Sequence, residues 1–163
     1  MTTSALTEQD RHHLRRCLDL AREALDAGDE PFGSILVDEE GQERFADRNR
    51  VAGGDRTKHP EFEIARWAAQ HLTPEERTVA TVYTTGEHCP MCAAAHAWVG
   101  LGRIVYASSS EQLSAWRTEW GIPAGPVAPL PINVVAPGIE VAGPDPEVSA
   151  EVRQLQARRY GQT

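Results

Sequence analysis

The chain has 163 residues, of which 40% are hydrophobic and 25% are charged. This composition is typical of a soluble globular protein, and the length fits one domain, residues 1–163, with a sizeable core. The formal net charge is −8, from 16 Lys and Arg against 24 Asp and Glu. Proteins that bind phosphate backbones usually have the opposite balance, which disfavours nucleic acid as a partner. The one basic segment, 153–160, is better interpreted as the solvated end of a helix.

Neither a membrane span nor an export signal is visible in the sequence. No apolar run approaches the roughly 18 residues that a membrane-spanning helix needs. Residues 1–16, MTTSALTEQDRHHLRR, lack the apolar core of a signal peptide. We therefore expect a cytoplasmic protein without membrane contact. Three cysteines, two of them close together, argue against a disulfide framework.

The first part of the chain predicts a helix followed by a hairpin. Residues 7–27 predict the helix, because apolar residues recur every three or four positions and Gly28 can end it. The run PFGSILV at 31–37 and the segment ERFADRN at 43–49 have strand length and are joined by a short turn, so they predict a β-hairpin. The segment RVAGGDRTK that follows predicts a loop.

The rest of the chain alternates helices with strands. We expect helices at about 58–72, 90–101 and 108–121, and strands at 78–85 (TVATVYTT) and 103–107 (RIVYA). Residues 122–144 are proline-rich, and Asp145 can cap a last helix that has Pro146 in its first turn. We interpret residues 122–163 as a C-terminal cap or tail segment of the single domain. Strands that alternate with helices predict a layered α/β fold.

The sharpest local motif is TTGEHCPMCAAA, which places Cys89 and Cys92 where a strand ends and a helix begins. Pro90 suits the first helical turn, since its missing N–H would be unpaired there anyway. The N-terminus of a helix favours thiolate over thiol, and two thiolates three residues apart can bind one soft metal ion. They could instead form a redox disulfide. Of these two interpretations we favour zinc.

A second motif, KHPEFEIARW, strengthens the zinc interpretation. Pro60 opens the predicted helix, which accounts for the proline but not for His59 before it or Glu61 after it. One imidazole and two thiolates make three zinc ligands and leave the fourth position to water, as in catalytic sites. Glu61 could reach that water and shuttle its protons. The residues thus predict one catalytic Zn²⁺ per chain, bound by His59, Cys89 and Cys92.

Together these residues resemble the zinc-dependent cytidine deaminase superfamily, whose signature is His-x-Glu followed by Pro-Cys-x-x-Cys. The resemblance covers about residues 8–120, with a gap of 30 from His59 to Cys89 and a similar order of helices and strands. It implies a three-layer α/β/α sandwich around a mixed sheet of roughly five strands. It also implies a hydrolase of C–N bonds in which Glu61 takes a proton from the water, then protonates the ring nitrogen and later the departing ammonia.

Within the superfamily, PFGSILV, Asn49 and CPMC look like the branch of guanine deaminases, fungal-type cytosine deaminases and bacterial tRNA adenosine deaminases. This likeness implies that Asn49 hydrogen-bonds the base and that Phe32 lies near the pocket, although plain core packing explains Phe32 as well. The implied substrate is a small aminated base of the guanine, cytosine or amino-triazine type. A tRNA-editing adenosine deaminase is the alternative, which the net charge disfavours. Members of the branch are commonly homodimers, and we expect one here.

Two positions depart from the family pattern, since His88 stands where proline is usual and Pro60 where alanine is usual. As a fourth ligand, His88 would close the zinc site, which gives a non-catalytic structural-zinc module as a hypothesis of another class. Otherwise His88 lines the pocket or lies on the surface.

The C-terminal region departs most from this branch. Trp120 is a candidate pocket residue, and Glu140 or Asp145 could supply the acidic group that contacts the base in guanine deaminases. We interpret His96 as a residue on a helix face, with pocket lining as the alternative, and Cys17 as a small buried hydrophobe.

Overall fold

The computed structural model describes residues 5–162, so the first four residues of the N-terminal segment and the last residue of the C-terminal segment lie outside the described part. At its centre is a five-stranded sheet with the strand order β2-β1-β3-β4-β5. The strands are β1 (Gly33–Val37), β2 (Glu43–Arg48), β3 (Thr81–Gly86), β4 (Ile104–Ser108) and β5 (Val141–Ala142). β1 pairs antiparallel with β2 and with β3, whereas β4 pairs parallel with β3 and with β5.

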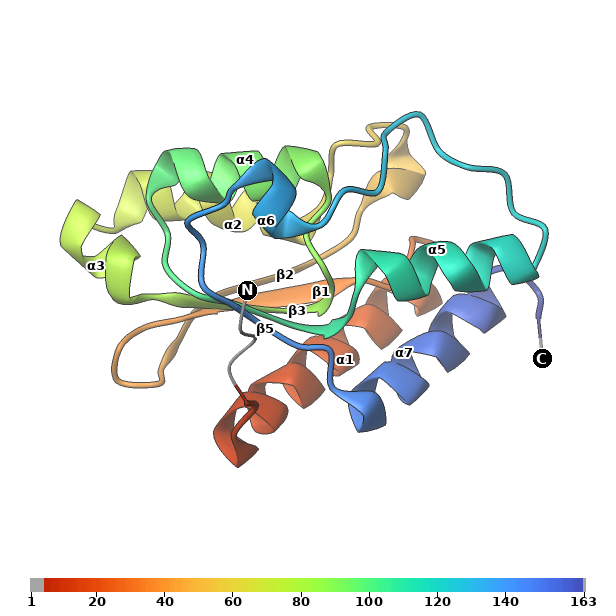
Figure 1. The fold of residues 1–163 in the computed structure, drawn as a ribbon, viewed down its shortest axis with the longest axis horizontal. Coiled ribbons are helices and arrows are strands. Elements are labelled where there is room, and N and C mark those ends of the chain that lie inside the picture. Colours follow the sequence, from red (N-terminus) through yellow and green to blue (C-terminus); the bar gives the residue numbers. More distant parts are fainter. Residues whose placement is uncertain (1–4, 163) are drawn as a thin grey trace.

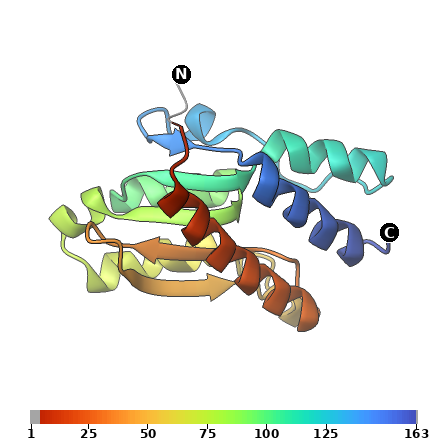
Figure 2. The same ribbon diagram turned by 90° about the horizontal axis from the view of Figure 1, so that it is seen from below.

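Helices cover both faces of this sheet (Figure 1). On one face α1 (Glu8–Asp26) and α7 (Pro146–Arg159) lie side by side, as Figure 2 shows from below. On the other face α2 (Pro60–His71) packs against α4 (Pro90–Val99), and the short α6 (Ile132–Val135) packs on α4. The connecting elements are η1 (Val51–Gly53), α3 (Pro74–Val79) and α5 (Ser110–Glu119). The predicted α/β class, a three-layer sandwich with a mixed five-stranded sheet, is confirmed.

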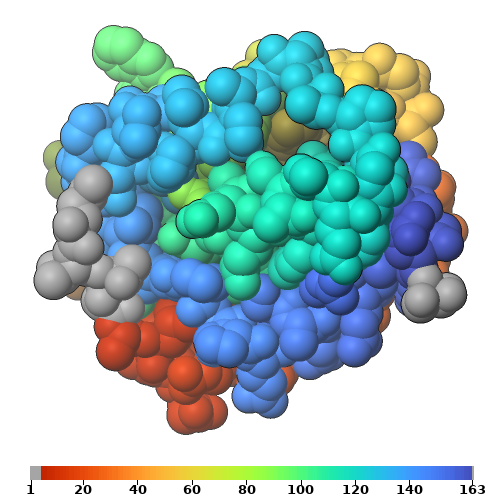
Figure 3. All heavy atoms as spheres, turned by 45° about the vertical axis from the view of Figure 1, so that its right-hand side comes forward, coloured from red at the N-terminus to blue at the C-terminus, as the bar shows by residue number. Residues whose placement is uncertain are grey.

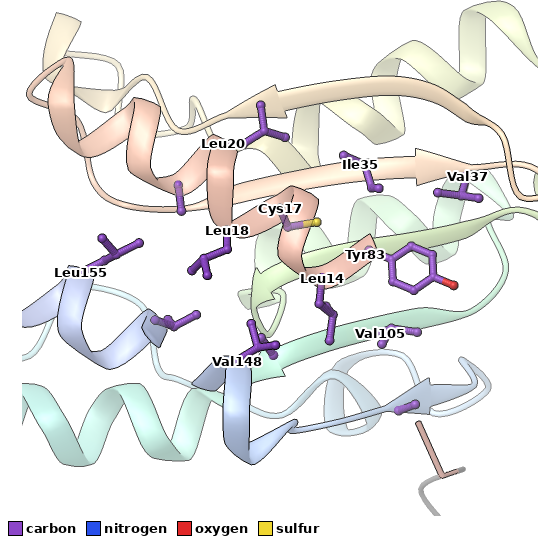
Figure 4. Packing of buried hydrophobic residues seen from close by; sticks show 14 residues of the cluster. Leu14, Cys17, Leu18, Leu20, Ile35, Val37, Tyr83, Val105, Val148 and Leu155 are labelled. Atoms are coloured by element: carbon purple, nitrogen blue, oxygen red, sulfur yellow. The ribbon is translucent and has the colours of Figure 1, made fainter. Parts of the chain in front are cut away.

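The apolar stripe of α1 explains how this helix packs. Leu14 and Leu18 are fully buried against the sheet and α7 (Figure 4). Cys17 lies in the same cluster, as a small buried hydrophobe should, and burial raises the pKa of its thiol. At the start of the helix the Thr7 hydroxyl accepts from the N–H of Asp10, and the Asp10 carboxylate accepts from the N–H of Thr7. This capping box satisfies two backbone donors and sets where the helix begins.

A buried carboxylate fastens α1 to the sheet. The Tyr83 hydroxyl donates to Asp10 over 2.9 Å, and the Arg103 guanidinium donates to both Asp10 oxygens over 2.9 and 3.2 Å. Burial raises the pKa of Asp10, but the hydrogen bonds from Arg103, Thr7 and Tyr83 outweigh it and bring this pKa down to about 2. The folded protein therefore holds Asp10 ionised.

On the opposite face, one arginine joins the C-terminal ends of α2 and α4. The Arg77 guanidinium donates to backbone carbonyls of both helices, at Ala68, Ala69, Leu72 and Val99, over distances from 2.8 to 3.4 Å. The last carbonyls of a helix have no partner within it, so a cation placed there stabilises both ends at once. Arg77 thus fixes the two helices relative to each other at the ends away from their first residues.

The strand expected at 78–85 is wrong in its first three residues, because Thr78 and Val79 belong to α3 and Ala80 is the C-cap residue of that helix. Thr73 starts this helix with a capping box, because its hydroxyl accepts from the N–H of Glu76 and the Glu76 carboxylate accepts from the N–H of Thr73. Pro74 occupies the first turn. These local signals outweigh the strand preference of Thr78 and Val79, and the strand begins only at Thr81.

The C-terminal part joins the main core. Asp145 caps α7 as predicted, since its carboxylate accepts from the N–H groups of Glu147 and Val148. Val148 and Val152 then bury their side chains against α1 and the sheet. Among residues 5–162 no helix is both long enough and apolar enough to cross a membrane.

Candidate metal centre and active site

The candidate site lies where α2 and α4 begin, at the end of the sheet where β3 ends. His59 is the N-cap residue of α2 and Cys89 is the N-cap residue of α4, and each is followed by a proline in the first turn. Neither N-cap side chain makes a capping hydrogen bond to the backbone of its own helix. Their polar atoms are therefore free to face each other across the two helix starts, together with Cys92 one turn into α4.

The three predicted ligands form a nearly equilateral triangle of donor atoms. The Sγ atoms of Cys89 and Cys92 are 3.5 Å apart, and each lies 3.5 Å from Nδ1 of His59. Tetrahedral zinc, with Zn–S near 2.3 Å and Zn–N near 2.0–2.1 Å, separates such ligand atoms by about 3.5–3.8 Å. The donor set and its spacing therefore fit one zinc ion. Glu61 and His88 are not members of this donor cluster.

The pKa values of the three cluster residues are shifted in different directions. Hydrogen bonds from Cys92 and His59 lower the pKa of Cys89 to about 4, although burial opposes them. The hydrogen bond to Cys89 raises the pKa of His59 to about 9, and the pKa of Cys92 is raised by the neighbouring Cys89 and by burial. These contacts favour ionisation of Cys89 before Cys92. A bound cation would displace protons from His59 and Cys92.

Glu61 lies beside the cluster in the first turn of α2 and is 6% exposed. The Thr84 hydroxyl donates to its Oε1 over 2.8 Å. Burial raises the pKa of Glu61, and the neighbouring His59 only partly opposes this shift. A carboxyl whose pKa moves toward neutrality is suited to accept and return a proton.

Asn49 and Phe32 lie together at the edge of the same region. The backbone N–H of Asn49 donates to the carbonyl of Phe32 over 3.0 Å, and the Asn49 side chain, 1% exposed, accepts from the N–H of Val51 over 3.1 Å. The Phe32 ring packs on Gly86, where an added Cβ would stand 3.0 Å from the ring. Phe32 therefore contacts the end of β3, from which the chain runs to Cys89. The contact of Phe32 with Gly86 supports a packing role, and its position near a substrate pocket stays a prediction.

His88 and His96 form a buried pair inside α4 and the loop before it. Both rings are 0% exposed, and they meet edge to face with centroids 5.4 Å apart. His96 Nε2 lies 2.7 Å from the carbonyl of Gly102 and donates to it, whereas neither His88 nitrogen has a hydrogen-bond partner within residues 5–162. Burial lowers the pKa of both rings, that of His96 to about 4. The surface interpretation of His88 is wrong, and its absence from the donor cluster leaves the closed-site hypothesis without support.

Three further predicted residues contact other parts of the chain. Trp120 ends α5, where its ring lies 6.2 Å from that of Tyr160 and 5.5 Å from the Arg153 guanidinium, between α5 and α7. Glu140 lies near the start of β4, and its carboxylate is 3.6 Å from the Arg103 guanidinium. The loop that leads from β3 to the cysteines lies beside the opposite end of β4, so Glu140 is at the wrong end of this strand to contact the cluster. Asp145 is committed to capping α7 and to Arg11, at 2.7 Å.

Glu87, two residues before Cys89, was not predicted as a site residue. Its carboxylate accepts from the N–H of Ser110, the first residue of α5, over 2.9 Å and from the N–H of Ile132, the first residue of α6, over 2.8 Å. The segment between these two bonds borders a groove of about 480 Å³, whose lining includes Glu87 and Tyr106. Figure 3 shows the surface hollowed between α5 and residues 121–131. The cysteine loop and this segment are thus held by one side chain.

In comparisons with known proteins, the matching family and the two relatives described below are all deaminases. The family described as "Cytidine and deoxycytidylate deaminase zinc-binding region" matches residues 7–108, which include all three cluster residues and Glu61. A probable cytosine deaminase of Schizosaccharomyces pombe is 33% identical over 150 residues, covering 88% of this chain and 89% of that protein. The guanine deaminase of Bacillus subtilis is 31% identical over 96 residues, covering 58% of this chain and 62% of that protein.

The fold is also found among solved structures. One that holds 2,6-diaminopurine superposes with a TM-score of 0.73 at 22% identity, covering 97% of this chain and 84% of that one. The five-stranded mixed sheet with helices on both faces is therefore shared over nearly the whole length of this chain.

Proposed function

The chain belongs to the cytidine and deoxycytidylate deaminase zinc-binding family, and from that premise we propose that it hydrolyses the exocyclic amino group of a small heterocyclic base. Water replaces the amino group, so that a ring carbonyl forms and ammonia is released. The observation that carries the proposal is the position of Glu61. It is buried beside the cluster of His59, Cys89 and Cys92 but outside its donor set, as a proton carrier must be.

The cluster residues and Glu61 divide the chemistry between them. Zinc bound by His59, Cys89 and Cys92 would act as a Lewis acid and lower the pKa of a water molecule toward neutrality. Glu61 would take a proton from the attacking water and pass it to the ring nitrogen. It would then take the second proton, from the hydroxyl group formed on the ring carbon, and pass it to the amino group, which leaves as ammonia while the ring carbonyl forms. Burial raises the pKa of Glu61, which makes the carboxylate a stronger base for taking the proton from water.

The substrate is proposed to be a free base of the guanine, cytosine or amino-triazine type. A net charge of −8 disfavours a nucleic-acid substrate, and the relative that matches over 89% of its own length is named a probable cytosine deaminase. We therefore place cytosine first. Asn49 is proposed to hydrogen-bond the base and Phe32 to pack near its ring, since both are tied to the strand ends beside the cluster.

The chain is further proposed to work as one domain and as a homodimer. Trp98 on α4 and Val134 on α6 are 89% and 62% exposed, and α4 and α6 are neighbours, so their apolar side chains are available to a second copy. Light scattering coupled to size exclusion tests this, and a mass of only 17.9 kDa would argue for a monomer.

The activity test is ammonia release by the zinc-loaded protein. The panel contains cytosine, 5-azacytosine, guanine, ammeline, adenine and the matching nucleosides, with Glu61→Gln as the control. Release from one or two free bases that stops in Glu61→Gln, at unchanged zinc content, supports the proposal. Activity retained in Glu61→Gln would refute the assigned role. Silence across the panel, together with salt-sensitive binding of stem-loop RNA, would favour the tRNA-editing alternative.

A further inference from the structure

Behind Glu61 lies a chain of buried hydroxyl groups. The hydroxyl oxygens of Ser34 and Thr84 are 2.8 Å apart, and Thr84 Oγ1 is 2.8 Å from Oε1 of Glu61. Ser34 and Thr84 are 0% exposed, and Glu61 is 6% exposed. The three residues come from β1, β3 and α2, so the contact joins the middle of the sheet to the helix above it.

The direction of these hydrogen bonds follows from the chemistry of the groups. An ionised carboxylate only accepts, so the Thr84 hydroxyl donates to Glu61. The oxygen of Thr84 then accepts from the Ser34 hydroxyl, which has a hydrogen to give. The carbonyl of Gly86, 3.1 Å from Thr84 Oγ1, is a second acceptor for the same hydrogen but a more distant one.

The sheet fixes this arrangement. Ser34 and Thr84 are directly opposite each other in the antiparallel pair of β1 and β3, so the register of the sheet keeps the two side chains next to each other. Thr84 also stands five residues before Cys89 on the strand that leads to it. The same strand therefore sets the position of a cluster residue and of the hydroxyl that holds Glu61.

Packing alone does not explain why residues 34 and 84 carry hydroxyl groups. Their neighbours on this face of the sheet, Leu36 and Val82, are apolar and 0% exposed, and they pack with Ile64 of α2 in one cluster. Valine has nearly the shape of threonine and would fill the space without burying a polar group. Within the described residues, Thr84 is the side chain that hydrogen-bonds the Glu61 carboxylate.

We propose that Thr84, supported by Ser34, is a positioning residue for Glu61, which it holds through Oε1 so that Oε2 is the oxygen left for proton transfer. The inference rests on the proposed function of Glu61. Thr84 touches neither the base nor the cluster in this account. It acts by restricting the rotation of a carboxylate that would otherwise be buried with freedom to turn away.

The test compares five variants of the zinc-loaded protein: Thr84→Val, Thr84→Ser, Ser34→Ala, the double variant Ser34→Ala/Thr84→Val, and Thr85→Val as the matched control. Thr85 is also fully buried on β3, but its hydroxyl accepts from the N–H of Gly33. It takes no part in the hydrogen bonds that join Ser34, Thr84 and Glu61. Thr85→Val therefore reports the general cost of losing a buried hydroxyl from this strand.

We expect kcat to fall by about 10- to 100-fold in Thr84→Val, the range for losing a hydrogen bond to a charged group, with KM and zinc content unchanged. Thr84→Ser should recover kcat to within about 3-fold, and Ser34→Ala should lose less than Thr84→Val. The double variant should match Thr84→Val, because Ser34 acts only through Thr84. Equal losses in Thr84→Val and Thr85→Val, multiplying effects in the double variant, or zinc loss would overturn the proposal.

A second readout does not depend on turnover. The side-chain carboxyl ¹³C resonance of Glu61, assigned by its absence in Glu61→Gln, should move in Thr84→Val and Ser34→Ala but not in Thr85→Val. An unmoved resonance would refute the hydrogen-bond chain. If Glu61→Gln keeps its activity while the resonance does move, the proposed function fails and the chain of hydroxyl contacts stands.

Discussion

Asp10 makes the stability of the protein depend on pH in a way that can be worked out from its contacts. Hydrogen bonds from Arg103, Thr7 and Tyr83 bring its pKa from the ordinary value of 3.8 to about 2, against the effect of burial. At about 1.4 kcal/mol per pKa unit, this difference stabilises the folded state by about 2 kcal/mol at neutral pH. A lowered pKa gives stabilisation that is present above 3.8 and is lost as the pH falls toward 2. About half of it should remain near pH 3.

The assay is urea unfolding of the wild type and of Asp10→Asn near pH 7 and near pH 3. Because asparagine does not titrate, the difference in unfolding free energy between the two proteins isolates Asp10 from all other acids and from the metal cluster. This difference should shrink by about 1 kcal/mol between the two pH values. Asp19→Asn is the control, since Asp19 lies on the same helix and contacts only the exposed Arg22. A difference that is equal at both pH values would refute the reasoning.

Four further changes test other parts of the molecule. Cys92→Ser should abolish tight zinc binding, measured as metal stoichiometry, and with it ammonia release; full zinc content would remove Cys92 from the ligand set. Arg77→Met removes donors to the carbonyl ends of two helices and should lower the free energy of unfolding by about 2 kcal/mol, seen as a fall of about 4–8 °C in Tm. An unchanged Tm would contradict the role of Arg77 in joining α2 and α4. Glu87→Gln leaves one helix N–H without an acceptor and should cost about 1 kcal/mol in urea unfolding at unchanged zinc content; loss of zinc would mean a different role. Gly33→Ala places a methyl group against the Cys17 carbonyl and Leu20, so α1 must move, and stability should fall by about 1–3 kcal/mol or more; a wild-type Tm would show that α1 yields freely.

The proximity of His59, Cys89 and Cys92 could be predicted because the signals for it are local. His59 and Cys89 each precede a proline that opens a helix, and the helix and strand patterns between them set their order in the fold. The capping role of Asp145 was equally local. The sequence does contain a signal for the missed helix α3, since Thr73 and Glu76 have the spacing of a capping box. The β-branched run after them was given too much weight.

The remaining site features depend on contacts between distant segments. Thr84 is one of several threonines in β3, and only its register opposite Ser34 and below Glu61 distinguishes it. Trp120 was a candidate as part of the C-terminal region that departs most from the branch, but its position is set by contacts of α5 with α7 that no local pattern reports. His88 is polar in sequence and fully buried in the fold, next to a second histidine eight residues away.

The two hydrogen bonds that Glu87 accepts from the first residues of α5 and α6 also affect how such a protein can diverge. Both ends of the stretch 110–132 are held by one carboxylate next to the cysteine loop, while residues 123–131 between them are exposed and bordered by few backbone hydrogen bonds. Insertions, deletions and exchanges within that stretch therefore leave both anchor points in place. The wall of the groove can therefore change shape, by natural drift or by directed evolution, without a change to the cluster of His59, Cys89 and Cys92.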